Sequence, residues 1–166
     1  MQEGNENGVT RSITLYKPCI EDLWFRKMLL ADPETMSYNA AWGGTIRFDE
    51  DRWQDWYDEW VDKPDKRFYR YVTAGASRAF VGETAWHYDG NEQKYIADVI
   101  IMARDRGKGF GKEALELLCR EARKQGITEL YDDIALDNPG VKLFLNCGFM
   151  EEYRTDQIIM VKKTLG

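Results

Sequence analysis

The sequence predicts an α/β (α+β) fold: a mixed, mostly antiparallel sheet of about seven strands, flanked by about four helices. Two observations support this prediction. Apolar segments joined by short turns, toward both ends of the chain, are typical of antiparallel hairpins. In the middle, a β-branched strand is followed by a long amphipathic helix and then another strand, and such a crossover joins parallel strands. The 166 residues suit one domain, which we expect to span residues 1–166.

The first third of the chain is expected to contain a strand, two helices and a long irregular segment. The strand is 13–16, and the first helix, 20–30, is amphipathic with acidic residues in its first turn. An Asp-Pro pair ends this helix, and the irregular segment 34–48 follows it. The second helix, 49–62, has an acidic face and an aromatic face. The aromatic face consists of Trp53, Trp56, Tyr57 and Trp60. Core packing is the simplest role for these rings, and lining a substrate pocket is the alternative.

The rest of the chain alternates strands with two further helices. The expected strands share β-branched or aromatic composition and turn residues at their ends: 67–74, 79–88, 95–102, 128–137, 149–155 and 157–163. A helix at 113–125 follows a glycine-rich turn, and Gly126 is a plausible C-cap. A short helix, 139–146, begins with Pro139 as its first residue and Asn138 as its N-cap.

The glycine-rich turn is the strongest functional signal in the sequence. Residues 104–112 read Arg-Asp-Arg-Gly-Lys-Gly-Phe-Gly-Lys. A glycine turn at the start of a helix presents free backbone N–H groups, which bind anionic phosphate. A P-loop is excluded because Arg106 and Glu113 stand where its first glycine and its hydroxyl residue belong. The G-x-G-x-x-G dinucleotide fingerprint is also excluded, because the three glycines are one residue too closely spaced.

The turn instead resembles the acetyl-CoA loop of the GNAT acetyltransferase superfamily, Arg/Gln-x-x-Gly-x-Gly/Ala. The match can begin at Arg104 or, two residues later, at Arg106. Residues 138–149 resemble the family's second block, which runs from an asparagine through Leu-Tyr to Gly-Phe. The alternative is that the glycines only allow the helix to pack against the strand. The resemblance extends over roughly residues 12–163, and its layout is most similar to the subgroup that includes ribosomal-protein N-terminal acetylases.

The resemblance implies a sheet that splays between its fourth and fifth strands, with acetyl-CoA as co-substrate and no metal. It implies that the cofactor is bound by the end of the central strand, by the glycine turn and by the second block. The residues concerned are Ile100, Ile101, Met102, Ala103, Arg104, Arg106, Gly107, Lys108, Gly109, Phe110, Gly111, Lys112, Asn138 and Phe144. It also implies that the first helical region and its loop form one wall of the acceptor cleft. The acceptor-side candidates are Tyr38, Trp42, Trp53 and Tyr57.

Acetyl transfer to an amine requires a group that accepts the amine's proton. Glu83 is the first candidate for this base, acting directly or through water, because it lies in a strand among apolar neighbours, where a charge is costly without a purpose. The alternative is a buried, hydrogen-bonded carboxylate. Asp98, within the central strand, is the second candidate. His87 is the only histidine, and it stands next to a turn, so we expect it at the surface.

The second block departs from the family pattern at two positions. Val141 replaces the usual alanine, and Phe144 replaces the tyrosine that often serves as the general acid. Phenylalanine cannot donate a proton, so Tyr38, Tyr88 or water takes that role, or the thiolate leaves without assistance from the enzyme. The missing tyrosine also supports the alternative function, a non-catalytic acyl-CoA-binding or regulatory module with the same fold.

The composition bounds the remaining function classes. The net charge of −6 argues against nucleic acid as the main partner and is compatible with a cationic substrate. No apolar run reaches the roughly 18 residues that a membrane span needs. The polar N-terminus is not a signal peptide, and we expect residues 1–11 to form a disordered tail. Three widely spaced cysteines fit no metal pattern and favour the cytoplasm. We therefore predict a cytoplasmic N-acetyltransferase in which a primary amine attacks acetyl-CoA directly in a ternary complex. The amine is either a small molecule or a protein N-terminus, and the oligomeric state, monomer or homodimer, is left open.

Overall fold

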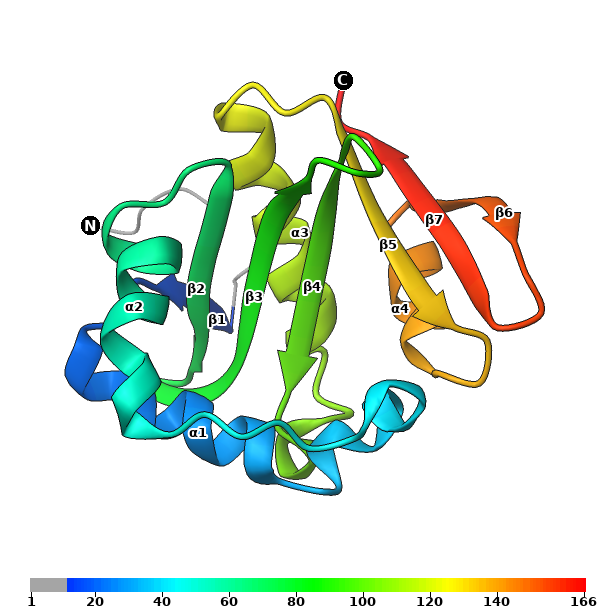
Figure 1. Cartoon of the computed structure of the whole chain (residues 1–166). Coiled ribbons are helices and arrows are strands. Elements are labelled where there is room, and N and C mark those ends of the chain that lie inside the picture. The colour runs from blue at the N-terminus through cyan, green and yellow to red at the C-terminus, as the bar shows by residue number, and fades with distance from the viewer. Residues whose placement is uncertain (1–11) are drawn as a thin grey trace.

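The structure is a computed structural model that describes residues 12–166. A seven-stranded sheet forms its centre (Figure 1). The strand order is β1-β2-β3-β4-β5-β7-β6. The strands are β1 (Ile13–Tyr16), β2 (Arg67–Ala74), β3 (Ala79–Asp89), β4 (Lys94–Ile101), β5 (Glu129–Ala135), β6 (Met150–Arg154) and β7 (Ile158–Thr164). The α-helices are α1 (Leu23–Ala31), α2 (Trp53–Tyr57), α3 (Phe110–Lys124) and α4 (Gly140–Asn146). The predicted disordered tail, 1–11, lies outside the described residues.

The pairing of β4 with β5 is the point around which the sheet is arranged. All other neighbouring strands are antiparallel, whereas these two are parallel because the crossover through α3 connects them. Their register in the described chain consists of one pair, Ile96 and Tyr131. Beyond that pair the two strands diverge toward their C-terminal ends (Figure 1). The predicted mixed sheet of seven strands, splayed between the fourth and fifth, is thus confirmed.

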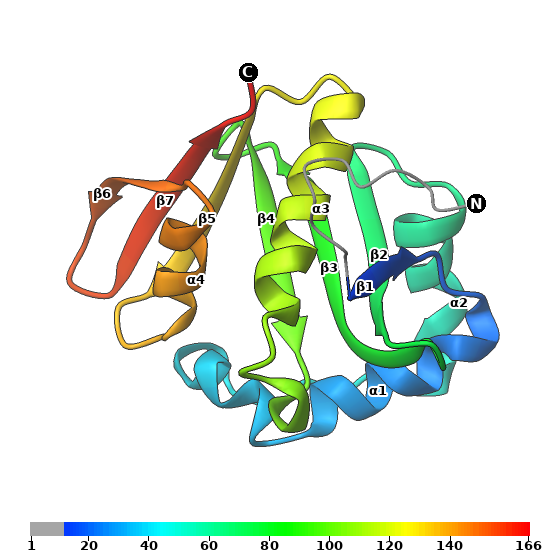
Figure 2. The same ribbon diagram turned by 180° about the vertical axis from the view of Figure 1, so that it is seen from behind.

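The two faces of the sheet bury separate hydrophobic clusters. Helices α3 and α4 cover one face, which we call the α3–α4 side (Figure 2). There the apolar stripe of α3, which includes Leu115 and Leu118, packs with Trp86. Helices α1 and α2 pack on the opposite face, the α1–α2 side, against Tyr69 and Tyr71. Because successive strand residues point to opposite faces, β2, β3 and β4 each contribute side chains to both clusters.

The helical segments differ from the predictions in detail. The irregular segment 34–48 contains a 3₁₀ helix, η3 (Thr35–Trp42), because the Asp32 carboxylate accepts a hydrogen bond from the Thr35 N–H at 3.2 Å and holds its first turn. The second predicted helix consists of α2 between a 3₁₀ turn and a π-helical turn, η5 (Asp58–Asp62). No helix of the described residues 12–166 is long and apolar enough to cross a membrane.

Candidate active site

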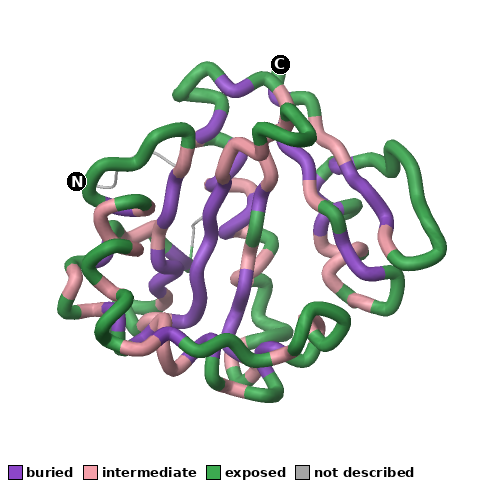
Figure 3. Tube along the Cα trace, in the orientation of Figure 1, coloured by how far each residue is buried: buried purple, intermediate pink, exposed green. Residues whose placement is uncertain are grey.

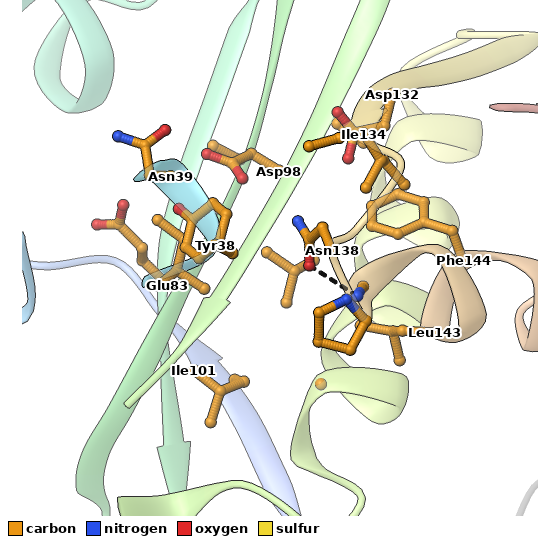
Figure 4. A pocket seen from close by; sticks show the side chains of 18 of the residues that line it. Tyr38, Asn39, Glu83, Asp98, Ile101, Asp132, Ile134, Asn138, Leu143 and Phe144 are labelled. Atoms are coloured by element: carbon orange, nitrogen blue, oxygen red, sulfur yellow. Dashed lines mark hydrogen bonds between the residues drawn. The ribbon is translucent and has the colours of Figure 1, made fainter. Parts of the chain in front are cut away.

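The divergence of β4 and β5 opens a cleft of about 910 Å³ in the sheet. The glycine turn and α4 line it from the α3–α4 side, and α1, η3 and α2 line it from the α1–α2 side. Figure 4 shows side chains from five elements around this space: Tyr38 (η3), Glu83 (β3), Asp98 (β4), Asp132 (β5) and Phe144 (α4). Glu83, Asp98 and Asp132 bring carboxyl groups to the cleft, and carboxyl groups favour the binding of a cation.

The backbone of β4 offers polar groups to the cleft. The Met102 N–H donates to the Val81 carbonyl at 2.8 Å, and alternate residues of an antiparallel ladder bond to the same neighbour. Ile100 therefore bonds to β3, whereas Val99 and Ile101 turn their backbone groups toward β5, which has diverged. Such groups can bind the amide and acyl groups of a cofactor arm. The sequence analysis missed Val99, because the hydrogen-bonding phase of a strand follows from its pairing and not from its composition.

Two of the predicted cofactor contacts are used within the protein. The Ala103 N–H donates to Thr35 Oγ1 at 3.0 Å, and Thr35 is fully buried. The Arg106 side chain donates from Nε to the Ile101 carbonyl at 3.1 Å and from Nη2 to the Thr35 carbonyl at 2.7 Å. Ala103 and Met102 do not line the cleft. Arg106 lines it, but these bonds direct its guanidinium to the junction between the glycine turn and η3.

The glycine turn has the geometry of an anion site. Gly107 and Gly109 have φ values of +78° and +83°, a conformation that favours glycine. Gly109 is the N-cap of the 15-residue helix α3 and has no side chain to satisfy the first N–H groups. Those groups, together with the positive end of the helix dipole, border the cleft at Phe110, Gly111 and Lys112.

Two basic residues of the turn lie outside the cleft. The Arg104 and Lys108 side chains are exposed, and each has its nitrogen 3.6 Å from an oxygen of Asp105. They were predicted to bind the cofactor, but they do not border the cleft. Positive charge at its rim therefore comes from Lys112 and from the helix terminus.

The second sequence block supplies the opposite wall of this arm of the cleft. The predicted cap is shifted by one residue, because Pro139 is the N-cap of α4 and Gly140 its first helical residue. Asn138 still binds the start of the helix, since its Oδ1 accepts a hydrogen bond from the Gly140 N–H at 2.8 Å. Asn138 also lines the cleft. Phe144 lines it from α4 and packs against Phe149, with ring centroids 4.9 Å apart.

Glu83 is held in a buried ion pair. Arg26 Nη1 lies 2.6 Å and 2.7 Å from the two carboxylate oxygens, and the Tyr69 hydroxyl donates a further short hydrogen bond. The Arg26 and Glu83 side chains are 16% and 6% exposed. The guanidinium also lies over the Trp56 ring, 4.5 Å from its centroid. Glu83 therefore has the contacts of the hydrogen-bonded carboxylate named above as the alternative to a base.

Asp98 is exposed, whereas the other residues of β4 are buried or intermediate. Figure 3 shows this mixed burial along β4. Its side chain is accessible from the cleft, but the protein atoms of the cleft walls lie close enough to desolvate its charge. This desolvation, with the negative charge of Glu83 as the next cause, raises the pKa of Asp98 to about 7. The Val99 N–H supports its charged form, and no side chain of the described residues donates a hydrogen bond to it. Asp98 thus changes its charge near neutral pH.

Asp132 is a cleft residue that the sequence analysis missed. It lies on β5 between Leu130 and Ile134, which are buried in the cluster on the α3–α4 side. Strand alternation turns its carboxyl group to that side. Burial, followed by the charges of Asp98 and Asp133, raises the pKa of Asp132 well above its ordinary value. Its position among apolar neighbours was a usable signal, since the same argument selected Glu83.

Only two of the four residues predicted on the acceptor side, Tyr38 and Trp42, line the cleft. Tyr38 and Trp42 of η3 line the cleft, and burial raises the pKa of Tyr38, so its hydroxyl stays protonated. Trp53 and Tyr57 do not line it; the Trp53 indole donates to the Phe48 carbonyl at 3.0 Å, and the Tyr57 hydroxyl donates to the Pro18 carbonyl at 2.9 Å. The cleft is lined instead by two other rings of the same aromatic face, Trp56 and Trp60.

His87 is half-buried in the wall of the cleft and does not lie at the surface as predicted. Its ring lies edge-on to Trp60, with centroids 5.8 Å apart. Burial, followed by the positive charge of Arg67, lowers the pKa of His87, so the ring is neutral at neutral pH. Within residues 12–166, no group of three or more metal-ligating side chains could hold a metal ion.

Comparisons with known proteins agree with this geometry. Solved structures with the same fold include the spermidine N-acetyltransferase from Vibrio cholerae in complex with CoA and spermine (TM-score 0.77, 20% identity, 93% of this chain and 96% of that chain covered). They also include a GNAT-family acetyltransferase from Bacillus anthracis (TM-score 0.75, 14% identity, coverage 93% and 96%). A third is the microcin self-immunity acetyltransferase MccE in complex with acetyl-CoA and AMP (TM-score 0.70, 15% identity, coverage 93% and 93%).

Comparison with curated protein sequences gives no significant match. The acetyltransferase (GNAT) domain family, in contrast, matches residues 12–150. That stretch includes the glycine turn, the cleft between β4 and β5, and the second sequence block. No finding supports the ribosomal-protein acetylase subgroup in particular. The chain therefore belongs to the acetyltransferase (GNAT) domain family.

Proposed function

We propose that the protein is an acetyl-CoA-dependent N-acetyltransferase in which a cationic primary amine attacks the thioester directly in a ternary complex. The N-terminus of α3 holds the pyrophosphate of acetyl-CoA, and the cleft-facing Val99 carbonyl and Ile101 N–H bind the arm that carries the acetyl group. The amine enters from the α1–α2 side, past Trp56 and Trp60, where aromatic faces attract cations. This proposal rests mainly on one observation: Asp98 and Asp132, which have no ion-pair partner among the described residues, line the cleft where β4 turns the Val99 carbonyl and the Ile101 N–H away from β3.

Asp98 is the base in this mechanism, in preference to Glu83. The Glu83 carboxylate is already engaged by Arg26 and Tyr69, whereas the Asp98 carboxylate has only the Val99 N–H as a donor within the described residues. An alkylammonium has a pKa of about 10, by analogy with lysine, and must lose a proton before it attacks. A carboxylate whose pKa is about 7 is a stronger base than an ordinary aspartate and is still ionised in half of the molecules at that pH.

Asp98→Asn tests the base and has a pH signature. We expect kcat to fall by about 10²–10⁴-fold, with unchanged affinity for acetyl-CoA by calorimetry, because the amide cannot accept the proton. In the wild type, kcat/KM should rise with pH through about 7, as Asp98 ionises. The same ionisation is costly in the folded state, so the stability contribution of Asp98 is present below about pH 4 and lost as the pH rises through 7. Asp98→Asn should therefore melt higher than the wild type at pH 8.

Thiol release from acetyl-CoA, measured over a panel of amines, tests the function itself. The panel should contain polyamines, because the Vibrio cholerae structure holds spermine, together with aminoglycosides and peptides with free N-termini. Release of CoA with at least one amine supports the proposal. If acetyl-CoA binds but no member of the panel increases thiol release, the non-catalytic acyl-CoA-binding module becomes the better interpretation.

A further inference from the structure

A thioester that loses its acyl group leaves a thiolate, and that thiolate needs a proton. An alkyl thiol has a pKa near or above the value of about 8.5 for cysteine, so the departing sulfur takes up a proton at neutral pH. Phe144 lines the cleft but has no proton to give. The cleft nevertheless contains a second carboxyl group for which the proposed reaction has no use so far, that of Asp132.

The geometry points to Asp132 as the general acid: its carboxyl group gives a proton to the CoA sulfur as the carbon–sulfur bond breaks. This inference rests on the acetyl transfer proposed above. The phosphate site at the start of α3 and the divergence of β4 and β5 define the two ends of the cofactor arm. Its sulfur, next to the acetyl group, then lies at the divergence, on the side from which the cofactor enters.

Asp132 faces that side of the cleft. Its neighbours two residues away on β5, Leu130 and Ile134, share a buried cluster with Phe144, so the Asp132 side chain points toward the α3–α4 side. Figure 4 shows Asp132 and Phe144 on one wall of the pocket, with Asp98 across from them. The two carboxyl groups are thus divided between the two strands that enclose the reacting atoms.

The charges around Asp132 favour its protonated form. Asp98 on β4 and Asp133 on β5 are the charged groups that act on it most strongly, and both are acidic. Tyr38 of η3 is the other titratable group that senses its charge, and its hydroxyl is neutral. The Asp133 N–H is the one hydrogen-bond donor that favours the ionised form, and no cation of the described chain compensates for the burial. A carboxylic acid is therefore available where the thiolate forms.

Tyr38 is the competing proton donor, and it is less suitable. Burial raises the pKa of Tyr38 above the ordinary tyrosine value, so its hydroxyl gives up a proton with more difficulty than a free tyrosine does. Raising the pKa of an aspartate, in contrast, favours the protonated carboxyl group, which is the form that a general acid needs. In Figure 4 the Tyr38 ring lies near Asp98 and Glu83, across the pocket from Phe144.

The step balances without a further reactant. The ammonium first loses one proton to Asp98, which passes it to the solvent. The neutral amine nitrogen then forms a bond to the thioester carbon, the carbon–sulfur bond breaks, and its electron pair leaves on sulfur. Asp98 receives the second proton lost by nitrogen, and Asp132 supplies the proton gained by sulfur. This second proton then returns from Asp98 to Asp132 through water, which restores both groups. The products are the acetylated amine, CoA with a free thiol, and one proton released to the solvent.

Asp132→Asn, Phe144→Tyr and the corresponding double variant test the inference together. Asp132→Asn keeps the side-chain volume and removes the acid, so we expect kcat to fall at least tenfold with the KM for acetyl-CoA little changed. Phe144→Tyr places a hydroxyl on the same wall. In the double variant it should restore kcat at least severalfold and shift the alkaline limb of the pH profile toward the tyrosine range, about 10. A structural role of Asp132 predicts no such rescue.

Two controls separate the possible failures. Glu129→Gln removes a carboxylate from the same strand outside the cleft and should leave kcat unchanged. Melting temperature and acetyl-CoA affinity show whether each variant is folded. Wild-type kcat and an unchanged pH profile in Asp132→Asn would overturn the inference, as would a loss of activity in Tyr38→Phe alone. If the wild-type enzyme acetylates no amine, the proposed function itself is wrong. This failure is distinguishable from a failure of the role of Asp132, because it is seen with the wild-type enzyme before any variant is measured.

Discussion

Glu83→Gln separates an ion-pair role of this carboxylate from a catalytic one. The substitution keeps the side-chain volume but leaves Arg26, whose side chain is 16% exposed, without a counter-charge. Removal of one partner from a buried ion pair typically costs about 3–5 kcal/mol. Two features reduce this cost: the amide oxygen of glutamine still accepts one hydrogen bond, and the guanidinium remains 4.5 Å from the Trp56 ring centroid. We therefore expect a loss of about 2–3 kcal/mol, or roughly 4–12 °C in Tm for a chain of this length.

Thermal and urea unfolding of a double-mutant cycle measures this coupling. Arg26→Met should also destabilise the protein, because it leaves Glu83 buried without a partner. The double variant Arg26→Met, Glu83→Gln should be more stable than the sum of the two losses predicts. Additive losses, or a Glu83→Gln variant within about 0.5 kcal/mol of the wild type, would refute the ion-pair argument.

The same variant reports on the base. The charge of Glu83 is the second cause of the raised pKa of Asp98, after burial. Its removal should therefore shift the acidic limb of kcat/KM to below pH 7 and change kcat by less than about tenfold. If Glu83 is the base, Glu83→Gln should instead lower kcat by about a hundredfold or more, and the acidic limb should disappear.

Two further predictions address the cofactor and acceptor ends of the cleft. Gly109→Asp should abolish acetyl-CoA binding in calorimetry, because a carboxylate would stand where the N-terminus of α3 meets phosphate. The matched control for backbone strain is Gly75→Asp, at a hairpin glycine with φ of +73°, and this variant should bind acetyl-CoA normally. Trp56→Ala should raise the acceptor KM by roughly 2- to 30-fold, from a cation–π contribution of about 0.5–2 kcal/mol, with the KM for acetyl-CoA unchanged. Trp53→Ala, outside the cleft, should lower Tm but leave the acceptor KM as it is; equal effects of the two variants on that KM would contradict the assignment of the walls.

Much of the fold and the cofactor end of the site could be predicted from the sequence, because both depend on local patterns. The glycine turn and the apolar stripe of α3 lie within about twenty consecutive residues, and each is fixed by local backbone preference and by helical periodicity. Asn138 was predicted as a cap for the same reason, since a cap bonds to a group two residues away. The splay between β4 and β5 was expected only through the family resemblance.

Which groups face the cleft was decided by tertiary structure. Glu83 and Asp132 occupy similar sequence contexts, because in each strand the residues two positions away, on the same face, are apolar. They differ because Arg26, 57 residues from Glu83 in the chain, pairs with Glu83, whereas no cation of the described chain pairs with Asp132. Ion pairs of this kind depend on distances in space, which composition and spacing do not encode.

The aromatic wall and the backbone donors illustrate the same limit at finer scale. The aromatic face of the second predicted helix is wide enough that its side chains have different neighbours. The Trp53 indole donates a hydrogen bond to the Phe48 carbonyl, whereas Trp56 and Trp60 border the cleft. Similarly, Val99 rather than Ile100 turns its backbone groups to the cleft, because the bond from Met102 to β3 sets the phase of the ladder. The sequence alone determined which segments build the site, whereas the packing of those segments decided which side of each one meets the substrate.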